Sequence, residues 1–281
     1  MALRDAVIRA GVIPADQVEQ KTKKRYSEML SHELAIEVAD GLRARGFATM
    51  KPMRETIKKG KKRGQIQIRK EKEFQGGLGP KRVDVSFSDD RHGLMLAVTI
   101  KCLNFPSYPK IPGSDPAQFD YSKTPNFSKN IKNRFGDLTT EAITLHLRFP
   151  FAVVGCLYVM PERSMTERGS HMKISTFERA SHLYGTITGR RIYGDPAEKF
   201  EDVTLLLHGP LKDPNRPEDV WVRLYQAGPG MKEILEPAYF QQILELYNDR
   251  NPHAMLGEDA DEGEVEFEEA DPEGAVEADE E

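Results

Sequence analysis

The sequence predicts one α/β domain over residues 1–257, with a central mixed β-sheet flanked by helices, and a disordered acidic tail over residues 258–281. Segments with helical periodicity alternate with apolar runs of strand length. The chain has 281 residues and is 38% hydrophobic, which suffices for one sizeable core. Composition changes sharply only near residue 257. We expect the core of the domain at about residues 26–161, with additional α/β elements over 162–257.

The charge of the chain is divided between a basic body and the acidic tail. The formal net charge is -5, but the tail holds fourteen Asp or Glu and no basic residue. The rest of the chain therefore has 40 Lys and Arg against 31 Asp and Glu, a net charge of +9. This excess predicts a surface that binds polyanions. The tail either aids solubility or competes with nucleic acid for that surface.

The first strong helical pattern covers residues 26–45. Its apolar stripe consists of Leu30, Leu34, Val38 and Leu42. On a helical wheel, Glu37 falls between Leu30 and Leu34. Glu33 lies at the edge of the stripe. Because a carboxylate aimed at a core is costly unless it is paired or binds a cation, we expect Glu37 to have such a partner.

A strongly basic segment follows at residues 51–72, with ten Lys or Arg against two Glu. Its Gly-flanked centre predicts a loop, and the residues after the loop predict an edge strand. The segment is either a solvated charged hairpin or an arm that contacts phosphates, and its one-sided charge favours the arm. The candidate nucleic-acid contacts are Lys58, Lys59, Lys61, Lys62 and Arg63.

The middle of the chain predicts a hairpin, a long loop, a helix and a buried strand. Strands are expected at 82–87 and 94–101, joined by a polar turn. Residues 104–128 contain five prolines and predict a long loop. A helix is expected at 130–150, and the apolar run at 151–161 predicts a strand buried on both faces. Further elements are expected near 171–185 (helix), 202–208 and 219–226 (strands) and 237–248 (helix).

Asp84 and Lys101 are the chemically informative residues of the hairpin. Asp84 lies in its first strand, and Lys101 ends the second. A carboxylate can hold Mg²⁺, which polarises a phosphate and lowers the pKa of an attacking water. A nearby lysine can orient that water and offset charge that develops in the transition state. Because side chains alternate along a strand, Thr99 shares a face with Lys101 and stands where a second carboxylate would complete such a site.

The order of these features resembles the PD-(D/E)xK nuclease superfamily over roughly residues 26–161. The resemblance is carried by "GPKRVDVSF", by "LAVTIK" and by the loop, helix and buried strand that follow; the stretch beginning "AVTIKCLNFP" looks closest to a group of restriction-type endonucleases. It implies a restriction-endonuclease-like core, with Asp84 as a metal ligand and Lys101 as the catalytic lysine. Thr99 departs from the superfamily pattern, because a neutral hydroxyl is a poor Mg²⁺ ligand.

Two explanations of Thr99 remain open. In this superfamily the second acid can lie on a neighbouring element, and Glu37 is the first candidate, followed by Glu33 and then by Glu141 on the second helix. Alternatively, the metal site is lost, and the chain is an inactive nuclease-fold subunit that binds nucleic acid or a partner protein within a larger complex.

The resemblance implies a Mg²⁺-dependent DNA endonuclease, with Mn²⁺ as a substitute ion, acting in restriction-modification or antiviral defence. An RNase or a DNA-repair nuclease would use the same residues. Because this fold usually needs two active sites to cut both strands, the resemblance also implies a homodimer or a larger defence complex.

Other functional classes find little support in the sequence. The chain lacks the GxxxxGK[ST] phosphate loop of NTP-driven motors. Its histidines show no ligand-like spacing, and Cys102 and Cys156 lie far apart, which predicts reduced thiols rather than a zinc site or a disulfide. No run approaches the eighteen apolar residues of a membrane helix, and the N-terminus lacks the apolar region of a signal peptide. We therefore expect a cytoplasmic protein without a membrane partner.

Overall fold

The computed structural model describes most of the chain up to residue 256. The described residues are 2–47, 51–52, 57–59, 66–68, 72–89, 92–114, 118–123, 126–167, 173–254 and 256. Of the expected phosphate contacts, Lys61, Lys62 and Arg63 lie outside these ranges, as does the acidic tail. Lys58 and Lys59 belong to a short strand for which the structure describes the backbone alone.

Helices and strands alternate along the described chain. The helices are α1 (Ala2–Arg9), α2 (Gln20–Arg43), α3 (Ser128–His146), α4 (Thr176–Gly185) and α5 (Glu236–Arg250), with short 3₁₀ turns η1 (Glu162–Met165) and η2 (Pro217–Asp219). The strands are β1 (Lys51–Pro52), β2 (Ile57–Lys59), β3 (Ile66–Ile68), β4 (Lys72–Gln75), β5 (Pro80–Val83), β6 (Val85–Asp89), β7 (Gly93–Cys102), β8 (Val153–Pro161), β9 (Asp202–Gly209), β10 (Trp221–Gln226) and β11 (Glu233–Ile234).

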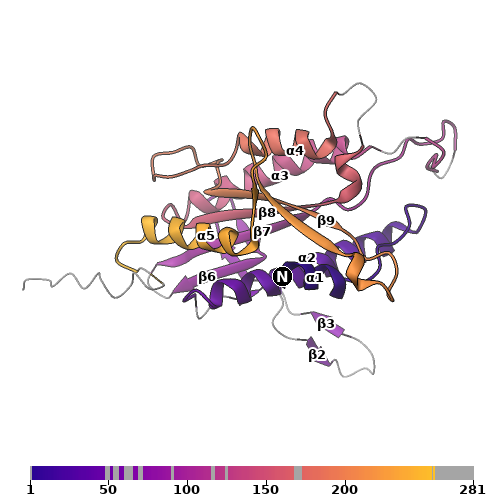
Figure 1. The fold of residues 1–281 in the computed structure, drawn as a ribbon. Helices are drawn as coiled ribbons and strands as arrows, with labels where there is room; N and C mark the ends of the chain where they lie inside the picture. Colours follow the sequence, from indigo (N-terminus) through magenta and orange to yellow (C-terminus); the bar gives the residue numbers. More distant parts are fainter. Residues whose placement is uncertain are drawn as a thin grey trace, which may run out of the picture.

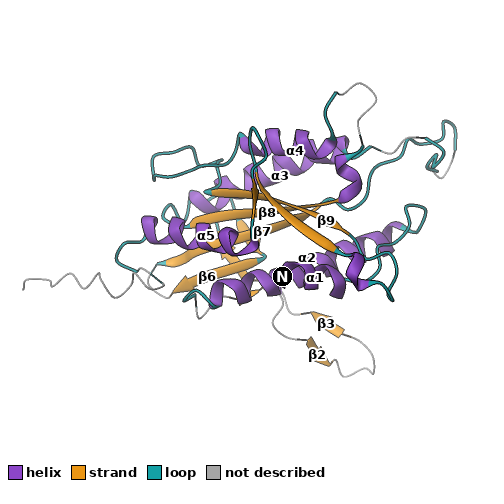
Figure 2. Cartoon of the chain, viewed as in Figure 1, coloured by secondary structure: helices purple, strands orange, loops and turns teal. Residues whose placement is uncertain are grey.

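The main sheet has seven strands in the order β1-β6-β7-β8-β9-β10-β11 (Figure 2). β7, β8 and β9 are parallel to one another, whereas β6 and β10 run antiparallel to their neighbours β7 and β9. Two further pairs, β2–β3 and β4–β5, form separate two-stranded sheets. The mixed sheet flanked by helices confirms the coarse fold that the sequence predicts.

Helices cover both faces of this sheet and create two hydrophobic cores. In Figure 1, α3 and α4 lie above the sheet, while α1 and α2 lie below it. On β7, Leu96, Val98 and Ile100 belong to the core shared with α2 and α5. Ala97 and Leu103 belong to the core shared with α3 and α4. Every residue of β8 is buried, as expected for a strand covered on both faces.

Two local features differ from the sequence expectation. The expected strand 82–87 is broken at Asp84, so that its first residues belong to β5, which pairs with β4 instead of β7. An additional helix, α1, packs on α2 and buries Leu3, Ala6 and Val7. With eight residues, α1 is too short for its periodicity to stand out, and tertiary packing stabilises it.

Cys102 and Cys156 are free thiols, as expected. Burial raises the pKa of the Cys102 thiol to about 12 and raises that of Cys156 well above its ordinary value. Neither cysteine is therefore a reactive thiolate at neutral pH. Within the described ranges, no helix is both long and apolar enough to cross a membrane.

Candidate active site

Asp84 lies at a fork between β5, which pairs with β4, and β6, which pairs with β7. The β6–β7 ladder ends with the pair Val85–Val98. Beyond that pair, the main-chain N–H of Ile100 donates to Asp84 Oδ2 at 2.6 Å, and the Thr99 hydroxyl donates to the same oxygen at 3.2 Å. The carboxylate thus takes over the place of a strand partner and satisfies a backbone donor of β7.

Glu141 of α3 forms an ion pair with Lys101, the candidate catalytic lysine. Lys101 Nζ lies 3.0 Å from Glu141 Oε2. The Glu141 side chain is only 1% exposed, so this ion pair is screened from water on the carboxylate side. Lys81 of β5 approaches the same oxygen, with Nζ at 2.8 Å. We call Lys81, Asp84, Thr99, Lys101 and Glu141 the fork cluster.

The charges of the fork cluster stabilise one another. Burial on its own would lower the pKa of Lys101, but the nearby carboxylates of Glu141 and Asp84 outweigh it and raise the pKa. Burial would likewise raise the pKa of Glu141, but Lys101 and Lys81 outweigh it and lower the pKa. Lys101 is therefore an ammonium and Glu141 a carboxylate at neutral pH.

The Glu141 carboxylate is held by ion pairs rather than by directed hydrogen bonds. Both of its oxygens are buried without a hydrogen bond of good geometry among the described residues, and Oε2 lies within ion-pair distance of Lys81 and Lys101. A buried acceptor in that state is unfavourable unless a cation, water or ligand group reaches it. In the described part of the chain, no group of three or more His, Cys, Asp or Glu side chains is placed to hold a metal. A metal at the fork would therefore have two protein carboxylates, those of Asp84 and Glu141.

The two other candidate acids lie away from the fork. Arg9 of α1 bonds both: its Nε donates to Glu33 Oε2 at 2.7 Å, and its Nη2 donates to Glu37. These contacts hold the pKa of the Arg9 guanidinium above its usual range. Glu37 thus has the partner that its position in the stripe demanded, but the partner is an arginine.

Strand alternation explains why Glu37 does not reach the fork. Thr99 shares its face of β7 with Ala97, which packs toward α3, whereas α2 covers the face of Val98 and Ile100. Helix α2 therefore lies on the wrong side of the sheet to supply the second acid. The structure thus brings Glu141, the third candidate, to Lys101, and places Glu37 and Glu33 beside Arg9 instead.

Lys81 is the site residue that sequence reasoning missed. Its signal was present in the spacing, because Lys81 and Val83 share a face of β5, and Val83 packs into the core under α3. Recognising it required knowing that the segment before Asp84 forms a separate strand.

A polar pocket lies near the end of β7, and its lining includes no residue of the fork cluster. It is lined by Gln20, Leu103, Asn130, Asn133, Arg134 and Asp137. Arg134 stands seven residues before Glu141 on α3, which is about two helical turns. Its guanidinium lies 3.3 Å from Asp137 and is half exposed. The pocket therefore presents a guanidinium and several amide groups on the helix that also carries Glu141.

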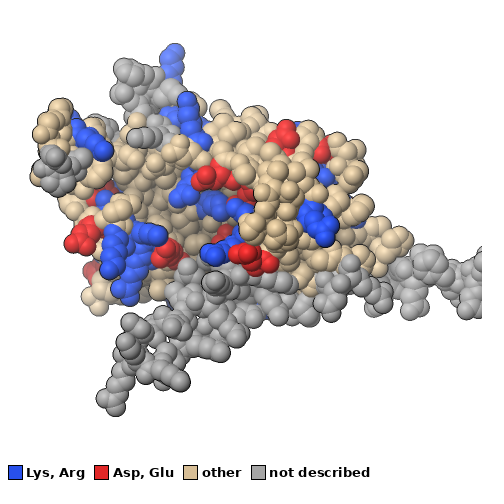
Figure 3. Space-filling model, turned by 180° about the vertical axis from the view of Figure 1, so that it is seen from behind, with Lys and Arg blue, Asp and Glu red and all other residues tan. Residues whose placement is uncertain are grey.

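The face opposite to that of Figure 1 carries both positive and negative side chains. Figure 3 shows Lys and Arg side chains interleaved with Asp and Glu on the face opposite to that of Figure 1. The described surface in this view shows both signs of charge and no broad patch of one sign. A broad basic patch that binds polyanions would have to lie outside the described surface of this face.

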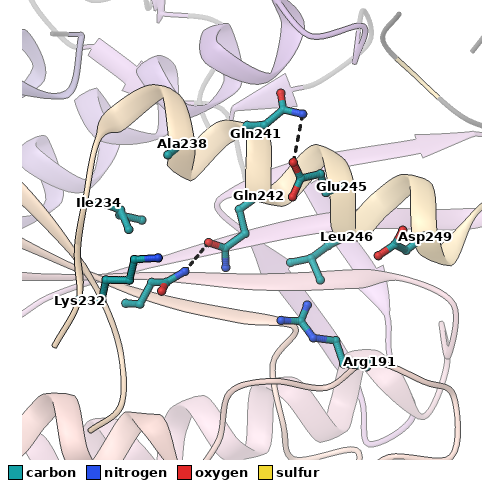
Figure 4. Close-up of a pocket in the computed structure, with 10 residues that line it drawn as sticks. Arg191, Lys232, Ile234, Ala238, Gln241, Gln242, Glu245, Leu246 and Asp249 are labelled. Atoms are coloured by element: carbon teal, nitrogen blue, oxygen red, sulfur yellow. Dashed lines mark hydrogen bonds between the residues drawn. The ribbon is translucent and has the colours of Figure 1, made fainter. Parts of the chain in front are cut away.

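A second pocket lies between β10, β11 and α5 (Figure 4). Gln226 donates to Gln242 at 2.7 Å, and Gln242 donates to the buried carboxyl of Asp202 at 2.7 Å. Burial raises the pKa of Asp202 to about 6. The amides of this pocket satisfy each other, and the acid behind them is enclosed, so the pocket lacks the acid–lysine chemistry of the fork.

Comparison with known protein families, with curated proteins and with solved structures found no match.

Proposed function

We propose that this chain is a Mg²⁺-dependent nuclease that hydrolyses phosphodiester bonds in DNA, with the fork cluster as its active site. One observation carries the proposal: Glu141 meets Lys101 beside Asp84. The second carboxylate that position 99 lacks is thereby supplied from helix α3. Two carboxylates and a charged lysine form the minimal set for metal-assisted phosphodiester hydrolysis.

Asp84 and Glu141 would hold the metal. Mg²⁺ is commonly bound by only one or two protein carboxylates, with water and substrate phosphate as its other ligands. The buried Glu141 carboxylate, whose two oxygens lack a hydrogen bond of good geometry among the described residues, fits such a role. When bound, the ion supplies positive charge at the phosphate and lowers the pKa of an attacking water.

Lys101 would act as a fixed cation. Because the carboxylates around it raise its pKa, it keeps its proton at neutral pH and does not serve as a general base. It can orient the attacking water and stabilise negative charge on the phosphate in the transition state. Its position at the end of β7, next to a central strand of the sheet, keeps this cation in place.

The neighbouring pocket supports a nucleic-acid substrate. Arg134, Asn130 and Asn133 project from the same helix as Glu141 and are suited to bind backbone phosphates next to the scissile one. Such contacts give affinity and salt sensitivity but no choice of sequence. The choice of DNA, and a place in restriction-modification or antiviral defence, follow from the resemblance of the chain to restriction-type nucleases.

One observation favours a second candidate function, that of an inactive nuclease-fold subunit. Both lysines of the fork cluster already neutralise Glu141, so the cluster is stable without a metal. In that case the fold would serve only to bind nucleic acid or a partner.

The proposal is tested by cleavage of supercoiled plasmid, linear DNA and a matched RNA in Mg²⁺ or Mn²⁺. We expect wild type to cut DNA, and Asp84→Asn, Glu141→Gln and Lys101→Met each to reduce the rate by about a hundredfold or more. Glu37→Gln is the matched control, because it removes a carboxylate that pairs with Arg9 on the other face of the sheet. Its rate should equal that of wild type. Thermal melts of each variant identify any loss of folding.

Three outcomes contradict parts of the proposal. Cleavage that survives in Glu141→Gln but is lost in Glu37→Gln would return the second acid to α2. Cleavage of RNA alone would change the substrate class. Salt-sensitive DNA binding without cleavage under any of these conditions would support the inactive subunit.

A further inference from the structure

We infer that Lys81 is an internal counter-ion that occupies the cation position at Glu141 and is displaced when a divalent metal binds. This inference rests on the proposed function, because it assigns a role to Lys81 in the same site. It adds a residue that the superfamily pattern does not include.

Two cations compete for the carboxylate of Glu141. The ammonium groups of Lys81 and Lys101 lie 2.8 and 3.0 Å from the same oxygen, Oε2, and like charges that close repel each other. Neither oxygen of this buried carboxylate has a hydrogen bond of good geometry among the described residues, so charge rather than directed hydrogen bonding holds the lysines there. A divalent cation can therefore take the place of one of them.

Lys81, rather than Lys101, is the cation that can leave. Lys101 lies on β7, between two neighbours of the main sheet, and is attracted by Asp84 as well as by Glu141. Lys81 lies on β5, which belongs to the separate two-stranded β4–β5 sheet. Its side chain is also the more exposed of the two, at 29% against 21%. Lys81 can therefore swing toward water with little effect on the main sheet.

Displacement of Lys81 changes the net charge of the fork cluster. With both carboxylates ionised and both lysines in place, the formal charges sum to zero, so a divalent cation gains no net attraction. When Lys81 moves away, the remaining groups carry a net charge of −1, and binding of Mg²⁺ raises it to +1. That charge matches one phosphodiester group, and the released ammonium of Lys81 is then available to contact the same strand.

The inference is tested by Mn²⁺ binding, measured by electron paramagnetic resonance of free Mn²⁺ in the absence of DNA. The variants are Lys81→Met and Lys81→Gln, which remove the counter-ion, and Lys81→Arg, which keeps the charge. Lys132→Met is the control for overall charge, since Lys132 is an exposed lysine on α3. Glu141→Gln is the control for the site.

We expect both neutral variants to bind Mn²⁺ about tenfold more tightly than wild type, equivalent to about 1.4 kcal/mol. Lys81→Arg and Lys132→Met should bind as wild type does, and Glu141→Gln should remove the gain when combined with Lys81→Met. Melting temperatures should rise more on addition of Mn²⁺ in Lys81→Met than in wild type.

Equal or weaker Mn²⁺ binding by folded Lys81→Met and Lys81→Gln would overturn the counter-ion role. If wild type still binds Mn²⁺ and cuts DNA in that case, the proposed function survives and only the inference on Lys81 fails. If no variant binds Mn²⁺ at millimolar concentrations, both the inference and the metal dependence of the proposed function fail.

Discussion

Replacing Glu141 by Gln tests the electrostatics of the fork cluster independently of any activity. The change keeps the shape of the side chain but removes the charge that Lys81 and Lys101 share. Neither lysine has another salt bridge within the described residues. The variant therefore leaves two ammonium groups close together with only Asp84 to attract them.

The expected loss of stability follows from burial. Removing one partner of a buried ion pair typically costs about 3–5 kcal/mol, because the remaining charge stays desolvated. Both lysine side chains retain some contact with water, so the lower end applies, and we expect Glu141→Gln to lose about 3 kcal/mol of unfolding free energy at pH 7. Glu37→Gln, which breaks an ion pair with a half-exposed arginine, should lose about 1 kcal/mol or less.

The lowered pKa of Glu141 determines how the stability loss in Glu141→Gln varies with pH. Glu141 has a pKa below its ordinary value of 4.5 in the folded chain, so its ionised form stabilises the fold above that pH. The stabilisation is lost as the pH falls below 4.5 and through the folded pKa. The difference between wild type and Glu141→Gln should therefore be largest near neutral pH and shrink in acid.

Urea unfolding followed by circular dichroism, at pH 7 and pH 4 in the presence of a chelator, measures both quantities. A loss below 1 kcal/mol at pH 7 for Glu141→Gln, or a difference from wild type that grows in acid, would refute this account of the fork cluster.

Two other buried carboxylates give contrasting predictions. Glu201 is fully buried and bonds Arg190 at 2.8 Å and Arg250 at 3.1 Å, so Glu201→Gln should lower the unfolding free energy by about 3 kcal/mol in urea titrations. An unchanged titration midpoint would contradict this. Asp202 behaves in the opposite way, because burial raises its pKa from 3.8 to about 6; its contribution to stability is present below pH 3.8 and is lost as the pH rises through 6. Asp202→Asn should therefore stabilise the chain at pH 7 by up to about 3 kcal/mol, with the gain in melting temperature absent near pH 4. A variant less stable than wild type at pH 7 would indicate that the hydrogen bond from Gln242 outweighs the burial of charge.

Local periodicity predicted the elements whose burial depends on their own sequence. The stripe of Leu30, Leu34, Val38 and Leu42 is fully buried in α2, and the apolar run after Pro150 forms β8. The same reasoning could not assign helices to faces of the sheet. A helical wheel identifies which side of α2 is apolar, but only the strand order decides that α2 covers Val98 and Ile100 rather than Thr99.

The choice among the candidate acids depends on that missing information. The helical wheel favours Glu37, because a carboxylate in an apolar stripe needs a partner. The partner turned out to be Arg9, which belongs to a helix too short to be predicted. Glu141, by contrast, lies on the helix between β7 and β8. A crossover helix must pack over the strands it connects, so this helix covers the face of β7 that carries Ala97, Thr99 and Lys101.

With Glu141 in position, a threonine at position 99 is the better residue for the fork. A carboxylate there would stand beside Asp84 and Glu141, and three like charges would raise one another's pKa until one of them took up a proton. The Thr99 hydroxyl donates to Asp84 at 3.2 Å and also helps to lower the pKa of Glu141. It thereby bonds one carboxylate and favours the ionised form of the other, which is the form that a divalent cation requires. Thr99 thus supports the carboxylates of Asp84 and Glu141, which other elements hold in place, and Lys101 remains next to two carboxylates.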